Sequence, residues 1–149
     1  MADRSAPEGL RTLPSWLVNQ VALLATRLVS DELATLGMRR YHYSLLTALD
    51  ERGPASQADL GRRTTIDRSD MVATVNELVE LGFVERTADP TDRRRNAVSL
   101  TTAGRRRLRQ LDRRVAAVQD ELLAPLSASE RTQLVALLTR VIDHRGAGS

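Results

Sequence analysis

The stretch SQADLGRRTTIDRSDMVATVNELVELGFVERTADPTDRRRNAVSLTTAG, residues 56–104, decides the fold. Asp59 follows Ser56 by three residues, and this pattern is typical of the capped start of a short helix. Residues 64–66 are expected to form a turn. Asp67 is expected to cap a second helix in the same way, ending at Gly82. We expect this helix to turn Met71, Val72, Val75, Leu78 and Val79 inward.

Two runs with β-branched residues, 83–87 and 97–100, flank the polar loop 88–96 and predict a β-hairpin. Thr101 is expected to cap a further helix that runs from Arg105 to about Leu123. The order helix, turn, helix, hairpin predicts a winged helix-turn-helix. Such a unit presents its second helix to the major groove of DNA and grips phosphates with the hairpin.

The segments on both sides of this unit are expected to be helical. Ser15 is predicted to cap a helix to about Leu36, a second helix covers about 39–50, and a capping box at Ser127 and Glu130 opens the last one. The first of these is apolar on more than one stripe, which indicates packing against another subunit. The predicted class is mainly α with a small β-hairpin wing (α+β).

The predicted organisation is a flexible arm and one domain. Residues 1–13 form the arm, and residues 14–149 form the domain. Within it, the winged helix-turn-helix covers about 39–101, and dimerisation helices cover about 15–36 and 102–145.

Charge is distributed unevenly along the chain. All 22 basic residues are Arg, and the segment 93–114 holds nine of them against one acid, Asp112. Such a block binds phosphate or forms a solvated helix face. With only 3% aromatic residues, the chain is poorly suited to bind single-stranded nucleic acid by stacking on its bases.

The absence of cysteine excludes disulfides and Cys-ligated zinc. No long apolar run or signal pattern is present, so we expect a cytoplasmic, nucleoid-associated protein that does not contact membranes.

The loop Asp89-Pro90-Thr91-Asp92-Arg93-Arg94-Arg95 is the sharpest local signal. An acid two residues before an arginine can brace its guanidinium by a bidentate pair. An arginine held in this way fits the narrow minor groove of A·T-rich DNA. The alternative is a solvated hairpin whose charges prevent aggregation. Because the loop directly follows a helix-turn-helix, we favour DNA binding over a solvated hairpin.

The second helix supplies the candidate major-groove contacts. With Val75 central to the buried face, helical geometry turns Ser69, Asp70, Ala73, Asn76 and Glu77 outward. Arg68 is long enough to reach out from the first turn, and Thr74 lies at the margin. Asp70 either stabilises its own helix N-terminus, the favoured interpretation, or accepts a hydrogen bond from cytosine N4.

The chain resembles the MarR family of bacterial transcription regulators over nearly its whole length. The resemblance is carried by residues 56–61, 67–69, 78, 81–86 and 89–94 and by residues 98–104. It implies a homodimer, with the first, fifth and sixth helices at the interface, that binds pseudo-palindromic promoter sites on double-stranded DNA. It also implies that the protein is a repressor. In many relatives, a small and often aromatic anion releases the repressor from its DNA site.

The resemblance also assigns roles by position. Asp92 braces Arg94, which enters the minor groove, while Arg68 and Ser69 face the major groove. The chain departs from the family at Asp70, Val72 and Ala73, where small hydroxyl or basic residues are usual, so the bases that it reads stay open. The predicted DNA-binding set is Gln57, Arg68, Ser69, Asp70, Ala73, Thr74, Arg93, Arg94 and Arg95.

The resemblance further implies a ligand pocket where the first, second and fifth helices meet the winged domain. The candidates, which could supply aromatic walls and a cation, are Trp16, Arg39, Arg40, Tyr41, His42 and Tyr43. The alternative, which we favour, is that Trp16 and Tyr43 are packing residues and that His42 is a hydrogen-bonded helix residue, because few convergent polar groups can be identified.

Other function classes find little support. The sequence has no nucleophile elbow, no glycine-rich phosphate loop and no zinc-ligand spacing, so we expect no enzyme, no catalytic residue and no cofactor. Its two histidines, 42 and 144, do not make a transition-metal site. Two alternatives stay open: a winged-helix interaction module without DNA binding, and a DNA-binding dimer without a ligand.

Overall fold

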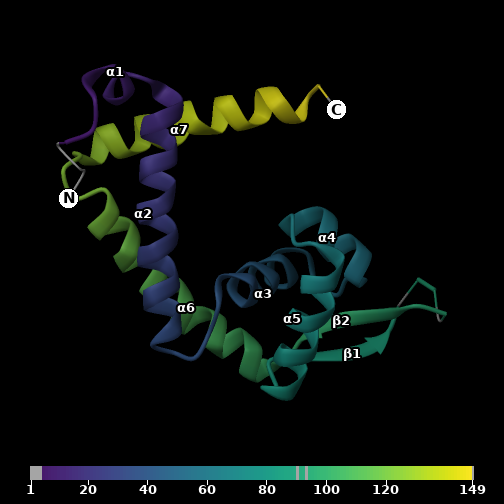
Figure 1. Ribbon diagram of the computed structural model, residues 1–149. Helices are drawn as coiled ribbons and strands as arrows, with labels where there is room; N and C mark the ends of the chain where they lie inside the picture. Colours follow the sequence, from purple (N-terminus) through teal and green to yellow (C-terminus); the bar gives the residue numbers. More distant parts are fainter. Residues whose placement is uncertain (1–4, 90, 93, 149) are drawn as a thin grey trace.

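The computed structural model describes residues 5–89, 91–92 and 94–148 and places a winged lobe beside long helices (Figure 1). The elements are α1 Glu8–Arg11, α2 Pro14–Ala34, α3 Arg40–Arg52, α4 Gln57–Thr64, α5 Arg68–Glu80, β1 Val84–Ala88, β2 Asn96–Leu100, α6 Thr102–Leu122 and α7 Ala128–Gly146. The lobe consists of α3, α4, α5 and the hairpin, and α2, α6 and α7 extend away from it. The predicted class, mainly α with a small β-hairpin, is confirmed.

The hydrophobic core lies in the winged lobe and at the ends of the two long helices that reach it. Leu33 is the only buried residue of α2, and it packs with residues such as Leu45, Leu60, Val75 and Leu111 of α3 to α6. None of the described residues of α7 is buried. The folded lobe therefore provides the rigid base for the site, while much of α2 and α7 has no packing partner within the chain.

Side-chain caps explain where three of the helices begin. Ser56 Oγ accepts the N–H of Asp59 at 3.2 Å, and Thr101 Oγ1 accepts the N–H of Gly104 at 3.0 Å. Ser127 and Glu130 form the reciprocal capping box that opens α7. These three predicted caps are confirmed.

Two other predicted caps are wrong. Ser15 lies inside α2, because the helix begins at Pro14, whose fixed φ suits a first helical position. Asp67 precedes α5 as expected but makes no side-chain cap hydrogen bond. Within residues 1–13, the segment predicted to be a flexible arm, Glu8–Arg11 forms the short helix α1.

The wing is a two-stranded antiparallel hairpin in which Val84 pairs with Leu100 and Ala88 with Asn96. Gly82, at φ +78°, turns the chain from α5 into β1. Ala55, just before α4, adds an isolated bridge: its N–H donates to Val98 O at 3.1 Å, and the N–H of Val98 donates to Ala55 O at 2.8 Å. This bridge, which the sequence did not predict, ties the start of the helix-turn-helix to the wing.

The start of α6 packs closely against the beginning of the hairpin. The N–H of Thr101 donates to Phe83 O at 3.1 Å, and its hydroxyl donates to Gly82 O at 2.7 Å. A Cβ at Gly104 would lie only 1.9 Å from the carbonyl oxygen of Phe83. Only glycine allows this approach, so the wing and α6 are held as one unit.

No helix within the described ranges is long and apolar enough to cross a membrane.

Candidate nucleic-acid interface

The first residues of α4 and α5 meet on one side of the winged lobe. Gln57 opens α4, Arg68 opens α5, and both line a hollow of about 470 Å³ together with Gly61 and Ile66. Arg68 is exposed. The structure therefore brings together two of the residues predicted to contact DNA.

The outward face of α5 largely matches the predicted set. Ser69, Asp70 and Ala73 are exposed together with Arg68. Thr74 must be removed from the set: only 1% of it is exposed, and its hydroxyl donates to Asp70 O at 2.6 Å. Its position, one step around the helix from Ala73, faces the core and is not available to DNA.

Val72 is a second difference on the same helix. It was expected to point inward, but it is 42% exposed. The buried face of α5 is narrower than predicted, because Met71, Val75 and Leu78 fill the space against α3 and α4.

Glu77 is held by two residues from the start of α3. Arg39 forms an ion pair with its carboxylate, and His42 Nε2 lies 2.6 Å from Oε2. His42 Nδ1 accepts the backbone N–H of Arg39 at 3.0 Å, so Nε2 carries the hydrogen and donates to Glu77. The hydrogen bond from Arg39, followed by that from His42, holds the pKa of Glu77 below its usual value. Glu77 thus fastens α5 to α3, and its charge is compensated within the chain.

A further contact joins α5 to the wing. The guanidinium of Arg86, in β1, donates to Asn76 Oδ1 on α5. Asn76 is exposed, as predicted, but neither residue belongs to the predicted DNA-binding set. The bond occupies the amide oxygen of Asn76, which therefore serves to orient the two parts of the site relative to each other.

At the wing tip, carboxylates bind the main chain. Asp89 Oδ1 accepts the N–H of Thr91 at 2.9 Å and its hydroxyl at 2.8 Å, and these hydrogen bonds hold the pKa of Asp89 below its usual value. The loop is closed by the N–H of Asp89, which donates to Arg95 O at 2.9 Å. Arg94 and Arg95 thus lie in a loop segment that is held by hydrogen bonds among its described residues.

Asp92 acts differently from the predicted brace. Its Oδ1 accepts the backbone N–H of Arg94 at 3.0 Å, and its Oδ2 lies 3.8 Å from Nε of Arg95. An acid two residues before an N–H is placed for such a turn, so the carboxylate orders the backbone of Arg94 rather than its guanidinium. Arg94 and Arg95 are both exposed. Arg93, predicted as a phosphate contact, lies outside the described residues.

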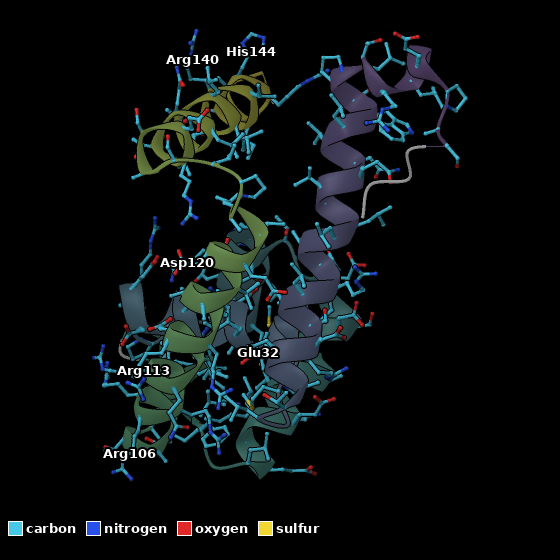
Figure 2. All side chains as sticks on the ribbon, turned by 90° about the vertical axis from the view of Figure 1, so that its left-hand side faces the viewer. Glu32, Arg106, Arg113, Asp120, Arg140 and His144 are labelled. Atoms are coloured by element: carbon cyan, nitrogen blue, oxygen red, sulfur yellow. The ribbon has the colours of Figure 1, made fainter. Side chains whose placement is uncertain are left out.

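The basic block continues along α6, where part of its charge is used for packing. Arg105 pairs with Asp50 at 2.7 Å, and Arg114 pairs with Glu32 at 2.9 Å. The guanidinium carbon of Arg107 lies 5.1 Å from the ring centre of Phe83. By contrast, Arg106 and Arg113 project outward from α6 (Figure 2). The block is therefore divided between arginines that are engaged within the chain and arginines that project outward.

The predicted ligand-pocket residues do not form one pocket within this chain. Arg39, Arg40 and Tyr41 line a hollow of about 370 Å³ next to the end of α2. His42 is buried, and both of its ring nitrogens are engaged. Trp16 lies about 21 Å along the axis of α2 from Ser30, which is the first residue of that helix to line this hollow. Trp16 is therefore not part of the hollow.

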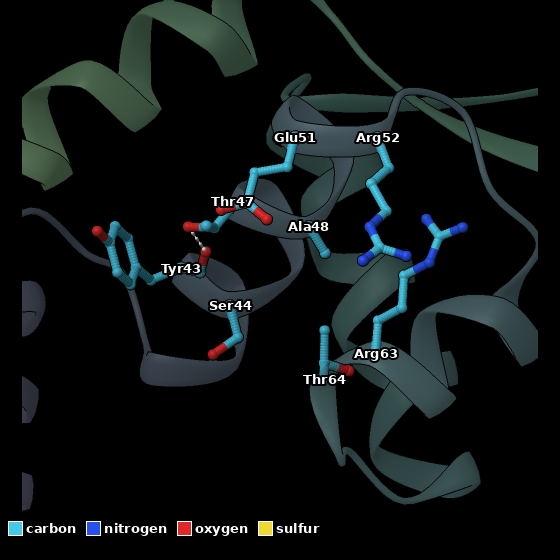
Figure 3. A pocket seen from close by; sticks show the side chains of 8 residues that line it. All are labelled: Tyr43, Ser44, Thr47, Ala48, Glu51, Arg52, Arg63 and Thr64. Carbon is cyan, nitrogen blue, oxygen red and sulfur yellow. Dashed lines mark hydrogen bonds between the residues drawn. The ribbon is translucent and has the colours of Figure 1, made fainter. Parts of the chain in front are cut away.

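Tyr43 lines a different hollow, of about 420 Å³, between α3 and the end of α4 (Figure 3). Its hydroxyl donates to Asp112 Oδ1 at 2.8 Å. Burial, followed by the hydrogen bond to Asp112 and the charge of that residue, raises the pKa of Tyr43 to about 12. The charged residues that also line this hollow are Arg52, Arg63 and Glu51, and the hydroxyl-bearing ones are Ser44, Thr47 and Thr64. No sequence motif indicated these two arginines, because they come from the ends of separate helices.

Among the described residues there is no group of three or more His, Asp or Glu side chains that could hold a metal ion.

The fold defines the chain as a winged helix-turn-helix protein, and comparisons with known proteins identify the family. A model of the MarR family matches residues 36–95. The HTH-type transcriptional repressor NicR of Pseudomonas putida is 33% identical over 98 residues, which are 66% of this chain and 62% of that protein. The matches span less than two thirds of the length of the curated relatives.

Two solved structures match over more of their length. A probable transcriptional regulator from Pseudomonas aeruginosa is 32% identical, with a TM-score of 0.78 over 89% of this chain and 98% of that one. PcaV from Streptomyces coelicolor, in complex with its natural ligand, is 30% identical, with a TM-score of 0.77 over 93% and 97% of the two chains. The chain therefore belongs to the MarR family of transcription regulators.

Proposed function

We propose that this protein is a homodimeric regulator that binds specific double-stranded DNA and represses a nearby promoter. One observation carries the proposal: the exposed start of α5 and the arginine-bearing wing tip project from the same rigid lobe (Figure 1). Arg68 and Ser69 would face the major groove, with Gln57, Asp70 and Ala73 at its edge. Arg94 would enter the adjacent minor groove, with Arg93 and Arg95 on phosphates.

The proposed dimer rests on the apolar surface of the long helices. The large hydrophobic residues of α2 and α7 that are exposed are Leu17, Val18, Val21, Leu23, Leu24, Val135, Leu137, Leu138, Val141 and Ile142. Monomeric proteins rarely leave so many large apolar side chains exposed. A second copy of the chain is the partner that would cover them and place two winged lobes on one duplex.

Two of the relatives point to repression of a promoter and to control by a small ligand. NicR is named a transcriptional repressor, and PcaV was crystallised with its natural ligand. By analogy, we propose that a small aromatic or other anion releases this protein from DNA. The hollow in Figure 3 is the candidate site, because the two arginines Arg52 and Arg63 outnumber the one acid, Glu51, in its lining and could bind a carboxylate. Tyr43, at the opposite side, could contact a ring.

The wing is tested by Arg94→Ala. If Arg94 enters the minor groove, its loss should cost about 1 kcal/mol at each of two wings, or about thirtyfold in Kd. The loss should be largest for duplexes with narrow, A·T-rich flanks. Fluorescence anisotropy with duplexes that differ only in the flanks measures both effects.

Arg145→Ala, which removes an exposed arginine near the end of α7, is the matched control and should bind like the wild type. Equal binding by Arg94→Ala would exclude the minor-groove role. If neither the wild type nor the variants bind any duplex, the protein is a winged-helix interaction module instead.

The ligand is tested by thermal shift against a panel of aromatic carboxylates. A ligand that binds only the native state at 100 times its Kd stabilises it by about 2.7 kcal/mol. We expect at least one compound to raise the unfolding temperature, and Arg52→Ala/Arg63→Ala to abolish the shift. If no compound raises that temperature or weakens DNA binding, the protein is a DNA-binding dimer without such a ligand.

A further inference from the structure

The exposed face of α5 carries one large apolar side chain, that of Val72. Val72 is 42% exposed, whereas Arg68 and Asn76, four residues before and after it, are exposed polar residues. Residues four apart on a helix are neighbours on one face, so Val72 lies between them. This face continues from the exposed Arg68, the residue proposed to enter the major groove.

The fold supplies no reason for a valine at this position. The buried face of α5 is complete with Met71, Val75 and Leu78, and Val72 is not part of the core cluster. Valine also has a lower helix propensity than alanine, so it does not benefit the helix itself. Its role is therefore expected to lie in what it contacts outside the chain.

The major groove offers a specific apolar partner. Among the base edges exposed there, the 5-methyl group of thymine is the apolar one, and small apolar side chains recognise it by direct contact. We propose that Val72 reads a thymine methyl group in each half-site. This proposal rests on the proposed function and adds a sequence preference to it.

The neighbouring side chains support this assignment. Asn76, which could otherwise read adenine with its amide, has its oxygen engaged by Arg86. Ala73 is exposed but carries only a methyl group, and Asp70 repels phosphate. Among these side chains, Val72 therefore has the size and apolar character to contact a thymine methyl group, while Arg68 and Ser69 can form hydrogen bonds with base edges.

The test uses a duplex selected by the wild-type protein from a random pool. Each thymine is replaced in turn by deoxyuridine, symmetrically in both half-sites, which removes the methyl group and keeps the hydrogen-bonding edge. Burial of one methyl-sized group contributes about 0.8 kcal/mol, or about fourfold in Kd. At one thymine position we expect the wild type to lose about sixteenfold over two half-sites.

Variants then assign the methyl contact to Val72. Val72→Ala should bind the thymine duplex more weakly and show no further loss with deoxyuridine at that position. Val72→Thr, which keeps one methyl group at Cβ, should retain part of the sensitivity. Leu81→Ala removes another exposed apolar side chain, just after α5, and should respond to deoxyuridine like the wild type.

Three results would overturn the proposal. The wild type could be indifferent to deoxyuridine at every position, or Val72→Ala could keep the full sensitivity, or Val72→Ala could bind as tightly as the wild type. Failure of the pool to yield any preferred duplex is a different result: it contradicts the proposed function itself, and it is seen before any thymine is replaced. Equal melting temperatures of the variants confirm that the exposed substitutions leave the fold intact.

Discussion

A Gly104→Ala protein will lose about 3 kcal/mol or more of its free energy of unfolding. The added Cβ would lie 1.9 Å from the carbonyl oxygen and 2.8 Å from the carbonyl carbon of Phe83. Overpacking usually costs about 1–3 kcal/mol, because flexible side chains give way. Here the obstacle is backbone that is also hydrogen-bonded to Thr101, so the whole contact between α6 and the hairpin must open.

The measurement is thermal unfolding at fixed protein concentration, since a dimer makes the midpoint concentration-dependent. A loss of about 3 kcal/mol lowers the midpoint by about 6–12 °C in a chain of this size. Gly146→Ala is the control, because no atom lies within 4 Å of its added Cβ. The packing described for α6 would be wrong if both alanine variants melted at the temperature of the wild type.

Val141→Asp/Ile142→Asp will produce a monomer that binds DNA at least about a hundredfold more weakly. These side chains are 65% and 70% exposed in the single chain, so two charges there leave the folded core untouched. Buried in a dimer, the same charges would lack partners and prevent association. Linking two DNA-binding units multiplies affinity by about 10²–10⁴, and dissociation removes this gain.

Sedimentation and anisotropy measure the mass and the Kd of the same sample. Ser129→Asp/Thr132→Asp changes two exposed polar residues of α7 and is expected to remain a dimer. A wild-type protein that is itself monomeric, or a double aspartate variant that still dimerises, would contradict the proposed interface.

The order of the elements could be predicted because its signals are local. Gly82 ends α5, Thr101 caps α6, and Ser127 with Glu130 opens α7, and each of these depends on residues a few positions apart. The errors arise where tertiary contacts decide. Helical periodicity alone cannot set the width of the buried face of α5. Val72, predicted to point inward, is therefore exposed, and Thr74, predicted at the margin, is buried.

The contacts that organise the site could not be predicted from local patterns. His42 and Glu77 are 35 residues apart, and the bridge between Ala55 and Val98 joins segments on either side of the helix-turn-helix. Asp92 is predicted to brace the guanidinium of Arg94, whereas its observed hydrogen bond to the backbone of Arg94 depends on the loop conformation. Arg52 and Arg63 come together only once α3 and α4 have packed.

The most direct test of DNA binding is a footprint of the wild-type protein on the DNA upstream of its own gene, repeated between 50 and 200 mM salt. We predict protection of two half-sites whose centres lie about 10–10.5 base pairs apart. Affinity should fall by about 10³–10⁵ over this range, since arginine–phosphate contacts release counterions. An unprotected duplex, or an affinity that hardly changes with salt, would contradict the assignment of the arginine wing and α5 to DNA.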